Sequence, residues 1–246
     1  MPKSQLSYGA GTLTFVANHY RGSDQTKTYV LPLPFIRYRS KTIEADNSMV
    51  RGTFFDSDFF QLKLSFMLGL AVESQENTAR AGMSNLDWTI EAGPMAIIKL
   101  WTSSDKTQSL TIEVPIRQIL ATDLTYLTPQ GIFAVPYLNY IVRPSPFTYN
   151  IGGEFSLAAM YGSAKFHDYF YGVSPQFVTP TRELYKAKAG YSGFQATLIL
   201  NYQYKDLVLI PFARYDNLSS VAFRDSPLFL KNEYFVAGTG IFYLFQ

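Results

Sequence analysis

The stretch that decides the fold is YFVAGTGIFYLFQ, residues 234–246, at the end of the chain. Every second side chain from Phe235 to Phe245 is apolar, aromatic or threonine, and the positions between include Gly238 and Gly240. Such a strand can cross the hydrocarbon layer of an outer membrane, which needs about 9 to 11 tilted residues. The pattern therefore fits the closing strand of a transmembrane β-barrel, although alone it also fits a strand of a β-sandwich.

The same two-residue alternation recurs through most of the chain. It is clearest at residues 6–16, 60–70, 88–100, 110–116, 132–142, 147–161, 194–204 and 208–212. Short turns at 102–106, 144–146 and 204–206 alternate with long loops at 73–85, 121–130, 162–189 and 217–229. A membrane barrel sorts its connections in this way, with short periplasmic turns and long external loops, whereas a sandwich has no reason to do so.

We therefore predict an all-β fold, with residues 1–246 forming a single antiparallel transmembrane β-barrel domain. A direct count gives about eleven strands if 28–55 is split in two, but a single-chain bacterial barrel needs an even number. If the last strand runs inward, the directions of the preceding strands require 28–55 to cross the membrane once, in the inward direction. The barrel then has about ten strands, and part of 28–55 forms an external hairpin. Twelve strands is the alternative, with the missed strand expected in 163–189. Prolines 94, 115, 136 and 211 should mark bulges or rim positions.

The composition narrows the class of protein. Charged residues make up 16% of the chain, against about 25% in typical soluble domains. A net charge of +2 without any Lys/Arg-rich block argues against a nucleic-acid partner. No cysteine is present, which excludes disulfides and thiolate metal sites, and no motif indicates a metal or another cofactor. The amino end has no apolar signal-peptide region, so we expect a mature chain with an added start methionine.

Seven charged residues fall on the predicted inward faces of the strands. They are Lys63, Glu91, Lys99, Glu113, Arg117, Glu154 and Arg214. Ten strands enclose a narrow lumen, where unpaired charges are costly, so we expect a salt-bridged network of both signs. The functional alternative is a narrow, mildly cation-lined pore for small anionic solutes.

A barrel-embedded hydrolase is the third candidate. Ser163, His167 and Asp168 lie within one loop. Catalytic triads are assembled from distant segments of a chain, so this local group is not the expected geometry. We therefore predict that the protein is not an enzyme.

Five pieces of sequence together resemble the MipA/OmpV family of outer-membrane barrels. They are YRGSD at 20–24, LPLPFIRY at 31–38, YFYGVS at 169–174, DSPL at 225–228 and GTGIFYLF at 238–245, and their order covers nearly the whole chain. The resemblance implies the outer membrane of a Gram-negative bacterium, with its lipid bilayer as surroundings. It also implies a non-enzymatic scaffold that links a murein hydrolase to a murein synthase, while other members are described as porin-like.

The same resemblance assigns expectations to particular residues. Family members end on an aromatic residue that serves as an assembly signal, so Phe245 and Tyr243 are the expected signal here, and Gln246 is a departure. From the residue types alone, we expect the aromatics of the loop piece with Tyr169, Tyr171 and Gly172 either to join the membrane-interface girdle or to fold inward over the lumen. A turn in the last external loop is expected at Asp225, Ser226 and Pro227. It either orders this loop or packs with the 169–174 piece over the mouth of the barrel.

Overall fold

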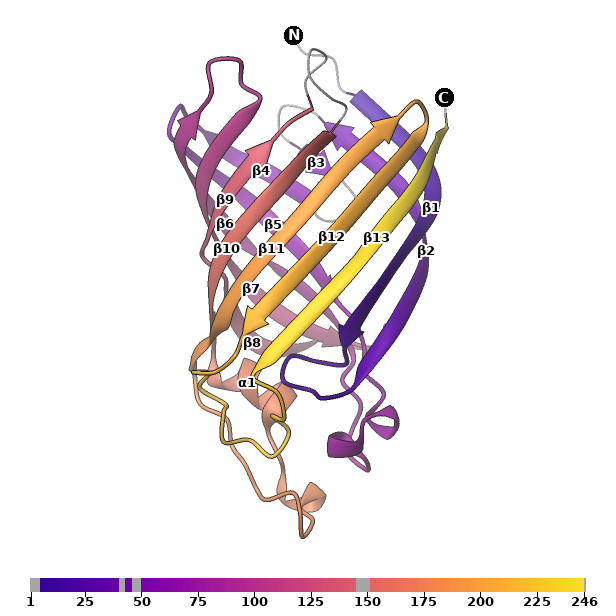
Figure 1. The fold of residues 1–246 in the computed structure, drawn as a ribbon. Helices are drawn as coiled ribbons and strands as arrows, with labels where there is room; N and C mark the ends of the chain where they lie inside the picture. The colour runs from indigo at the N-terminus through magenta and orange to yellow at the C-terminus, as the bar shows by residue number, and fades with distance from the viewer. Residues whose placement is uncertain (1–4, 40–42, 46–49, 145–150, 246) are drawn as a thin grey trace.

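A computed structural model describes residues 5–39, 43–45, 50–144 and 151–245. Strands tilted around one axis form its wall, and both ends of the chain lie at the same end (Figure 1). The strands are β1 (Gln5–Asn18), β2 (Thr26–Arg39), β3 (Ile43–Ala45), β4 (Val50–Asp56), β5 (Phe60–Gly69), β6 (Trp88–Thr102), β7 (Gln108–Thr122), β8 (Thr128–Ala134), β9 (Tyr137–Val142), β10 (Ile151–Gly162), β11 (Gly190–Tyr204), β12 (Leu207–Asn217) and β13 (Glu233–Phe245). The helices are α1 (Ala164–Tyr171) and the single turns η1 (Ser74–Glu76), η2 (Thr78–Arg80) and η3 (Pro175–Phe177).

The sheet closes on itself. Consecutive strands pair antiparallel except for β8 and β9, which both lie between β7 and β10, and β1 pairs with β13. β8 and β9 together occupy the place of one strand, which is interrupted at Val135 and Pro136. The described residues therefore form a wall of twelve strands. The predicted antiparallel barrel is confirmed, and the alternative number of strands is the one observed.

The two additional strands lie at a different place from the one predicted. They are β3 and β4, which form a hairpin after β2, whereas 163–189 contributes α1 and η3. The predicted external location of the hairpin is wrong, because β3 pairs with Tyr38 and Arg39 at the end of β2 that lies beside the chain termini. Parity fixes the net number of crossings, but it does not say which rim carries an extra hairpin.

The connections are sorted by length. Residues 57–59, 103–107 and 205–206 join strands at the end with the termini, which we call the turn end. Residues 19–25, 70–87, 163–189 and 218–232 lie at the opposite end, which we call the loop end. The predicted long loop at 121–130 is mostly strand, and only 123–127 separate β7 from β8.

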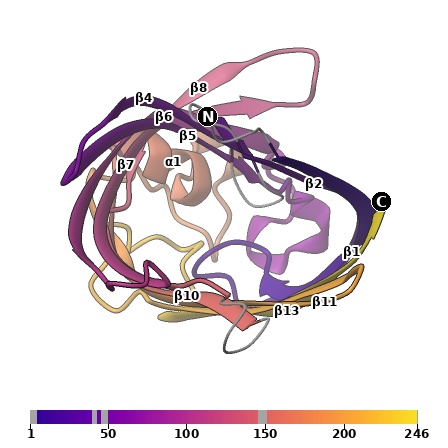
Figure 2. The same ribbon diagram turned by 90° about the horizontal axis from the view of Figure 1, so that it is seen from above.

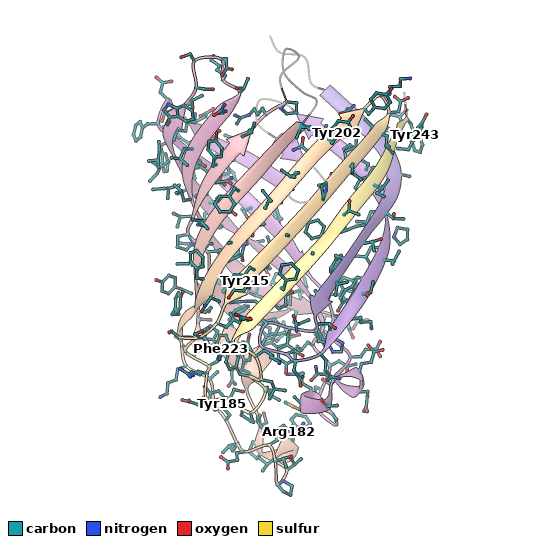
Figure 3. The ribbon with its side chains drawn as sticks, in the orientation of Figure 1. Arg182, Tyr185, Tyr202, Tyr215, Phe223 and Tyr243 are labelled. Atoms are coloured by element: carbon teal, nitrogen blue, oxygen red, sulfur yellow. The ribbon has the colours of Figure 1, made fainter. Side chains whose placement is uncertain are left out.

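The outward face of the wall is apolar. Exposed large side chains include Leu6, Val30, Leu68, Phe155, Leu198 and Ile241, all at outward positions of their strands. Tyr202 and Tyr243 project from the wall near the turn end, and Tyr215 projects nearer the loop end (Figure 3). Aromatic residues near both rims of an apolar band are the arrangement expected of a membrane-spanning barrel. Among the described helices, none combines the length and apolarity that a membrane crossing requires.

The lumen also contains an apolar cluster. Buried Phe35, Val208 and Phe242 pack together with Leu33, Ile210 and Leu244 on the inward faces of β2, β12 and β13. A Cβ on Gly11 would lie 2.6 Å from a ring carbon of Phe242, so the glycine makes room for this ring inside the wall. An apolar cluster therefore lies inside the barrel in addition to the predicted lumen charges, because β13 is apolar on both of its faces.

The four prolines singled out in the sequence lie at or beside interruptions of the ladders. The β6–β7 ladder skips the residues between the pairs Ala92–Gln118 and Met95–Pro115, which include Pro94. The β11–β12 ladder skips Pro211, and Pro136 separates β8 from β9. A proline lacks the N–H that a ladder needs, so these breaks have a local cause in the sequence.

Replacing Phe245 by alanine should lower the fraction of chains assembled in the membrane. Its outward ring lies 6.0 Å from that of Tyr8 on the neighbouring strand, and Phe235 occupies the same face at the other end of β13. Either alanine variant removes an aromatic side chain from lipid, at a cost of about 1.5 to 3 kcal/mol. If Phe245 is also an assembly signal, heat-modifiable mobility on gels will show fewer folded chains for F245A than for F235A. Equal folded fractions for F245A and F235A would contradict the role of Phe245 as an assembly signal. The predicted departure at Gln246 lies outside the described residues.

Candidate functional site

Four external segments pack together over the loop end of the barrel. They are residues 19–25, 70–87, 163–189 and 218–232, which we call the mouth cover. Seen from the turn end, α1 lies within the ring of strands (Figure 2). The segments share a hydrophobic core of Tyr20, Val72, Leu86, Tyr171, Leu218, Val221 and Phe223. A hydrophobic core of this kind holds the segments together as a small folded unit rather than as separate loops.

Hydrogen bonds at both ends of α1 fix where the helix begins and ends. The Ser163 side chain accepts a hydrogen bond from the Phe166 N–H, which caps the first turn. At the other end the Gly172 N–H donates to the Asp168 carbonyl at 2.8 Å, and a Cβ on Gly172 would lie 2.6 Å from the Asp168 carboxylate. This short helix therefore places Phe166, Phe170 and Tyr171 toward the lumen and the cover.

Tyr171 is the centre of the mouth cover. Its ring stacks on Phe223 with centroids 3.7 Å apart, and its hydroxyl donates to the Arg21 carbonyl at 2.8 Å. The Ser226 hydroxyl donates to the Tyr171 carbonyl at 2.7 Å, which joins the last loop to α1. Phe223 was not singled out from the sequence, although it lies just before the DSPL piece.

The remaining loop residues have more peripheral places. The Tyr169 hydroxyl accepts a hydrogen bond from the Asp87 N–H at 2.8 Å, and burial raises the pKa of Tyr169 to about 12. Asp225 is exposed and Pro227 is half-buried. Between the two arrangements considered for these loop pieces, the structure places Tyr171 and Ser226 in contact over the mouth.

Two arginines link the loops to one another. The buried Arg80 guanidinium donates to the Phe170 carbonyl at 2.9 Å and lies over the Tyr20 ring. Arg182 donates to the carbonyls of Ala79 and Ala81 at 2.8 and 3.1 Å, and Figure 3 shows it in the part of the cover farthest from the strands. These bonds join 70–87 to 163–189, so each loop holds the other in place.

A fully buried carboxylate, Asp216, ties the cover to the barrel wall. Its oxygens accept from Arg214 at 2.8 and 2.6 Å and from Nε of Arg21 at 2.9 Å. Arg21 belongs to the β1–β2 loop and also donates to the Ser192 carbonyl at the start of β11. The sequence prediction included Arg214 but missed Asp216, although the two-residue spacing on β12 puts both on the inward face.

The other predicted lumen charges divide into separate groups. Arg117 lies 3.6 Å from Glu91 and donates to the Ser65 hydroxyl at 2.8 Å. Glu113 accepts hydrogen bonds from Thr111, Tyr137 and Asn139. Lys63 is buried on the same side of the lumen, and Glu154 lines the cavity described next. Lys99 is apart from them at the turn end, where it pairs with Asp56 at 2.9 Å.

A cavity of about 380 Å³ lies beneath the mouth cover. Its polar lining includes Arg21, Glu91, Arg117, Asn139, Glu154 and Arg214, and its apolar lining includes Met67, Phe133, Val135, Ile199 and Tyr171. Its volume is within the range of small-molecule sites, about 300 to 1,000 Å³. No group of three His, Asp or Glu side chains within the described ranges could hold a metal ion.

The residues considered for hydrolysis do not come together. Ser163 caps α1, Asp168 accepts from the Ala187 N–H, and His167 lies 2.5 Å from the hydroxyl of Ser192 instead. The Nδ1 atom of His167 faces the Lys188 carbonyl at 2.6 Å, so it carries the proton and Nε2 accepts from Ser192. Both side chains are fully buried, which indicates a structural hydrogen bond rather than a nucleophile open to substrate.

Acidification should loosen the mouth cover. Burial away from water lowers the pKa of His167 below 6.5, with a further contribution from Arg21, against the opposing hydrogen bond to Lys188. The opened cover therefore binds a proton that the closed cover does not, and closure loses stability as pH falls below about 6.5. Protease cleavage within 163–189 should be faster at about pH 5.5 than at about pH 7.5.

The histidine variants separate this cause from general acid effects. Burial also lowers the pKa of His19, which is less enclosed, so H167Q should remove more of the pH dependence than H19Q. An unchanged pH profile in the double variant would contradict the assignment.

Comparison with known proteins gives one family. Residues 10–245 match the family model described as MltA-interacting protein MipA. The solved structures of Pseudomonas putida OprB and of a Pseudomonas aeruginosa FadL homologue are similar, at 10% and 11% identity and TM-scores of 0.40 and 0.34. They cover 86% and 88% of this chain, which spans only 49% and 60% of theirs. No curated protein matches the chain.

Proposed function

Because this chain belongs to the MipA family, we propose that it is a closed barrel of the Gram-negative outer membrane that serves as a docking scaffold for a murein enzyme. The observation that carries the proposal is the interlocked mouth cover, in which Tyr171 contacts both the β1–β2 loop and the last external loop. A pore for free diffusion needs a clear mouth, whereas a scaffold needs a rigid one.

The charges in the lumen support the same function. Asp216 is enclosed by two arginines, and Glu91 faces Arg117. Removing one partner of such a buried pair is strongly destabilising, and charges that are paired with one another attract a passing ion less than free charges do. The proposed role of the predicted lumen residues is therefore structural.

The turn end is the face that periplasmic partners would meet. At its β6–β7 turn, Asp105 accepts from the Thr107 N–H at 3.1 Å and from the Thr107 hydroxyl at 2.9 Å. Lys106 adopts a left-handed conformation with φ of 58°, which fixes the direction of the turn. Such a rigid, exposed turn suits a docking surface, because little flexibility is lost when a partner binds.

The test measures binding of a purified MltA-type murein hydrolase to the barrel in lipid nanodiscs. D105A should weaken binding about tenfold, which corresponds to about 1.4 kcal/mol. The matched control is D123A, since Asp123 makes the same hydrogen bonds to Thr125 at the opposite end of the barrel. Failure of the parent chain to bind, or equal losses in both variants, would contradict the proposal.

Conductance in planar bilayers separates the scaffold from a narrow channel. We expect the parent barrel to be silent, because the cover closes the mouth. Steady ion-selective current steps would instead support a small-solute channel that uses the cavity beneath the cover.

A further inference from the structure

The β7–β8 hairpin leaves the barrel wall at the loop end. Seen from the turn end, β8 and the connection before it project outside the ring of strands (Figure 2). Among the described ladders, β10 pairs with β8 only at its last two residues, whereas β7 pairs with β8 as far as Thr128. The β7–β8 register shifts between Gln118 and Leu120, and such a bulge bends the strand that carries it. The tip of the hairpin, residues 123–127, therefore points away from the barrel axis.

The helix α1 explains why the hairpin lies outside the wall. After β10 the chain enters α1, and the Phe166 ring stacks on Phe133 inside the barrel with centroids 4.5 Å apart. Ser163 replaces the missing ladder partner, because its N–H donates to the Ile132 carbonyl at 2.9 Å and its hydroxyl accepts from the Ile132 N–H at 3.0 Å. Gly131 has a φ of 92°, and a Cβ there would lie 2.8 Å from the Phe166 nitrogen. The glycine therefore lets β8 pass close over the start of α1 and continue outward.

The tip is held in one conformation by side-chain hydrogen bonds. The Asp123 carboxylate accepts from the Thr125 N–H at 2.9 Å and from the Thr125 hydroxyl at 2.7 Å. The Tyr126 hydroxyl donates to the Asp87 carboxylate at 2.7 Å, which ties the tip to the residue before β6. A tip fixed in this way loses little flexibility when it binds, so it can present its exposed side chains to a partner at low cost.

The side chains that the tip presents are apolar. Leu124 is 90% exposed and Leu127 is 60% exposed, with Tyr126 between them. Leu124 also has a φ of 78°, in the left-handed region that bulky side chains rarely adopt and that glycine or asparagine normally fills in turns. An apolar residue in an unfavourable conformation, facing water on a rigid turn, gains nothing in the isolated molecule. Backbone outliers of this kind are grounds for a functional hypothesis.

The tip lies at the height where the lipid-facing wall ends. Trp88, the first residue of β6, pairs with Thr122 and is half exposed. Leu124 follows Thr122 by two residues, so it lies within about 7 Å of that height, at about 3.3 Å per residue. Tyr161 and Phe235 are exposed at the same end of β10 and β13. Exposed tryptophan and tyrosine mark the interface of a membrane with water, so the tip extends the lipid-facing surface sideways at that interface.

We propose that the tip is a lipid anchor, in which Leu124 and Leu127 enter the membrane leaflet that meets the loop end. The continuity of the tip with the lipid-facing wall favours acyl chains as the occupant over a second protein surface. Its only charged residue is Asp123, whose carboxylate is engaged by Thr125, so the tip offers no cation to an anionic headgroup. Tyr126 stays at the level of the headgroups. The anchor does not depend on the docking partner proposed above.

The test uses a single introduced cysteine that carries a nitroxide spin label, because the chain has no cysteine of its own. L124C is reconstituted in lipid nanodiscs at one barrel per disc. Electron paramagnetic resonance then measures how often the label collides with oxygen, which is concentrated in lipid, and with a nickel complex that stays in water. We expect the L124C label to collide more with oxygen than with the nickel complex.

Two further labelled positions calibrate the measurement. L68C reports lipid, because Leu68 is 73% exposed on the outward face of β5, and L184C reports water, because Leu184 is 62% exposed in the mouth cover. A collision ratio for L124C near that of L68C would support the anchor, and a ratio equal to that of L184C would overturn it. Heat-modifiable mobility on gels shows that each labelled barrel is folded.

A second measurement separates lipid from another copy of the chain. In liposomes at rising protein density, the L124C labels should show no dipolar broadening, and oxidation of unlabelled L124C should give no disulfide-linked dimer. Either signal in folded barrels would put the tip against a second copy of the chain and would overturn the lipid anchor.

Discussion

Replacing Asp216 by alanine should destabilise the protein by about 3 to 5 kcal/mol, which is the usual cost of removing one partner from a buried ion pair. The carboxylate is fully buried and is the common acceptor of Arg21 and Arg214, so its loss leaves two neighbouring guanidinium groups without their counter-ion. They would repel each other across the space it occupied. The measurement is the temperature at which the barrel loses its heat-modifiable mobility.

The position of the damage is a sharper readout than the total. Arg21 joins the β1–β2 loop to the wall, so the D216A variant should lose protection from hydrogen exchange first in 19–25 and in the start of β11. D225A is the matched control, because Asp225 lies in the same cover but is exposed. An unchanged unfolding temperature in D216A, or an equal loss in D225A, would contradict the role of this ion pair.

Replacing Phe223 by alanine should open the mouth of the barrel. The ring is fully buried, stacks on Tyr171 and contacts Phe229 edge to face, and removal of a buried phenylalanine side chain costs about 3 to 5 kcal/mol. The cover is small and has few other core residues, so we expect it to lose its packed state while the hydrogen-bonded wall stays folded. Ion conductance in planar bilayers should then rise from silence to measurable steps.

The control for this prediction is L230A, since Leu230 lies in the same loop but is 46% exposed. It should leave the barrel silent. Faster protease cleavage of F223A within 163–189, with unchanged heat-modifiable mobility, would show that the cover alone has opened. If F223A stays silent although its cover is cleaved, the lumen itself must be closed below the cover, and the mouth cover would not be what excludes ions.

The fold follows from local patterns in the sequence. Alternation of period two assigns each residue to one face of its strand. For the closing strand this assignment agrees with the structure, in which Phe235, Ile241 and Tyr243 point outward. Loop lengths and parity gave the direction of the crossings, because a strand that crosses a membrane must end at the opposite side. The position of the short β3–β4 hairpin could not follow from parity, which counts net crossings only.

The candidate site was only partly predictable. Alternation placed Glu91, Arg117 and Arg214 inside, since facing inward is a property of one strand and its register. Which charges meet depends on strand stagger and on loops that return from distant parts of the chain, as when Arg21 reaches Asp216 across 195 positions. Lys99 shows the opposite case, because its inward position near the rim leads to Asp56 rather than to the other lumen charges.

The sequence by itself determined the barrel, because side-chain alternation, proline positions and the lengths of turns are written residue by residue. Only the tertiary structure decided that the mouth is covered, that an apolar cluster lies inside the barrel beside the lumen charges and that the β3–β4 hairpin lies at the turn end. The first two of these depend on contacts between residues far apart in the chain. Such contacts form only when distant segments pack together, so no single segment of the sequence specifies them.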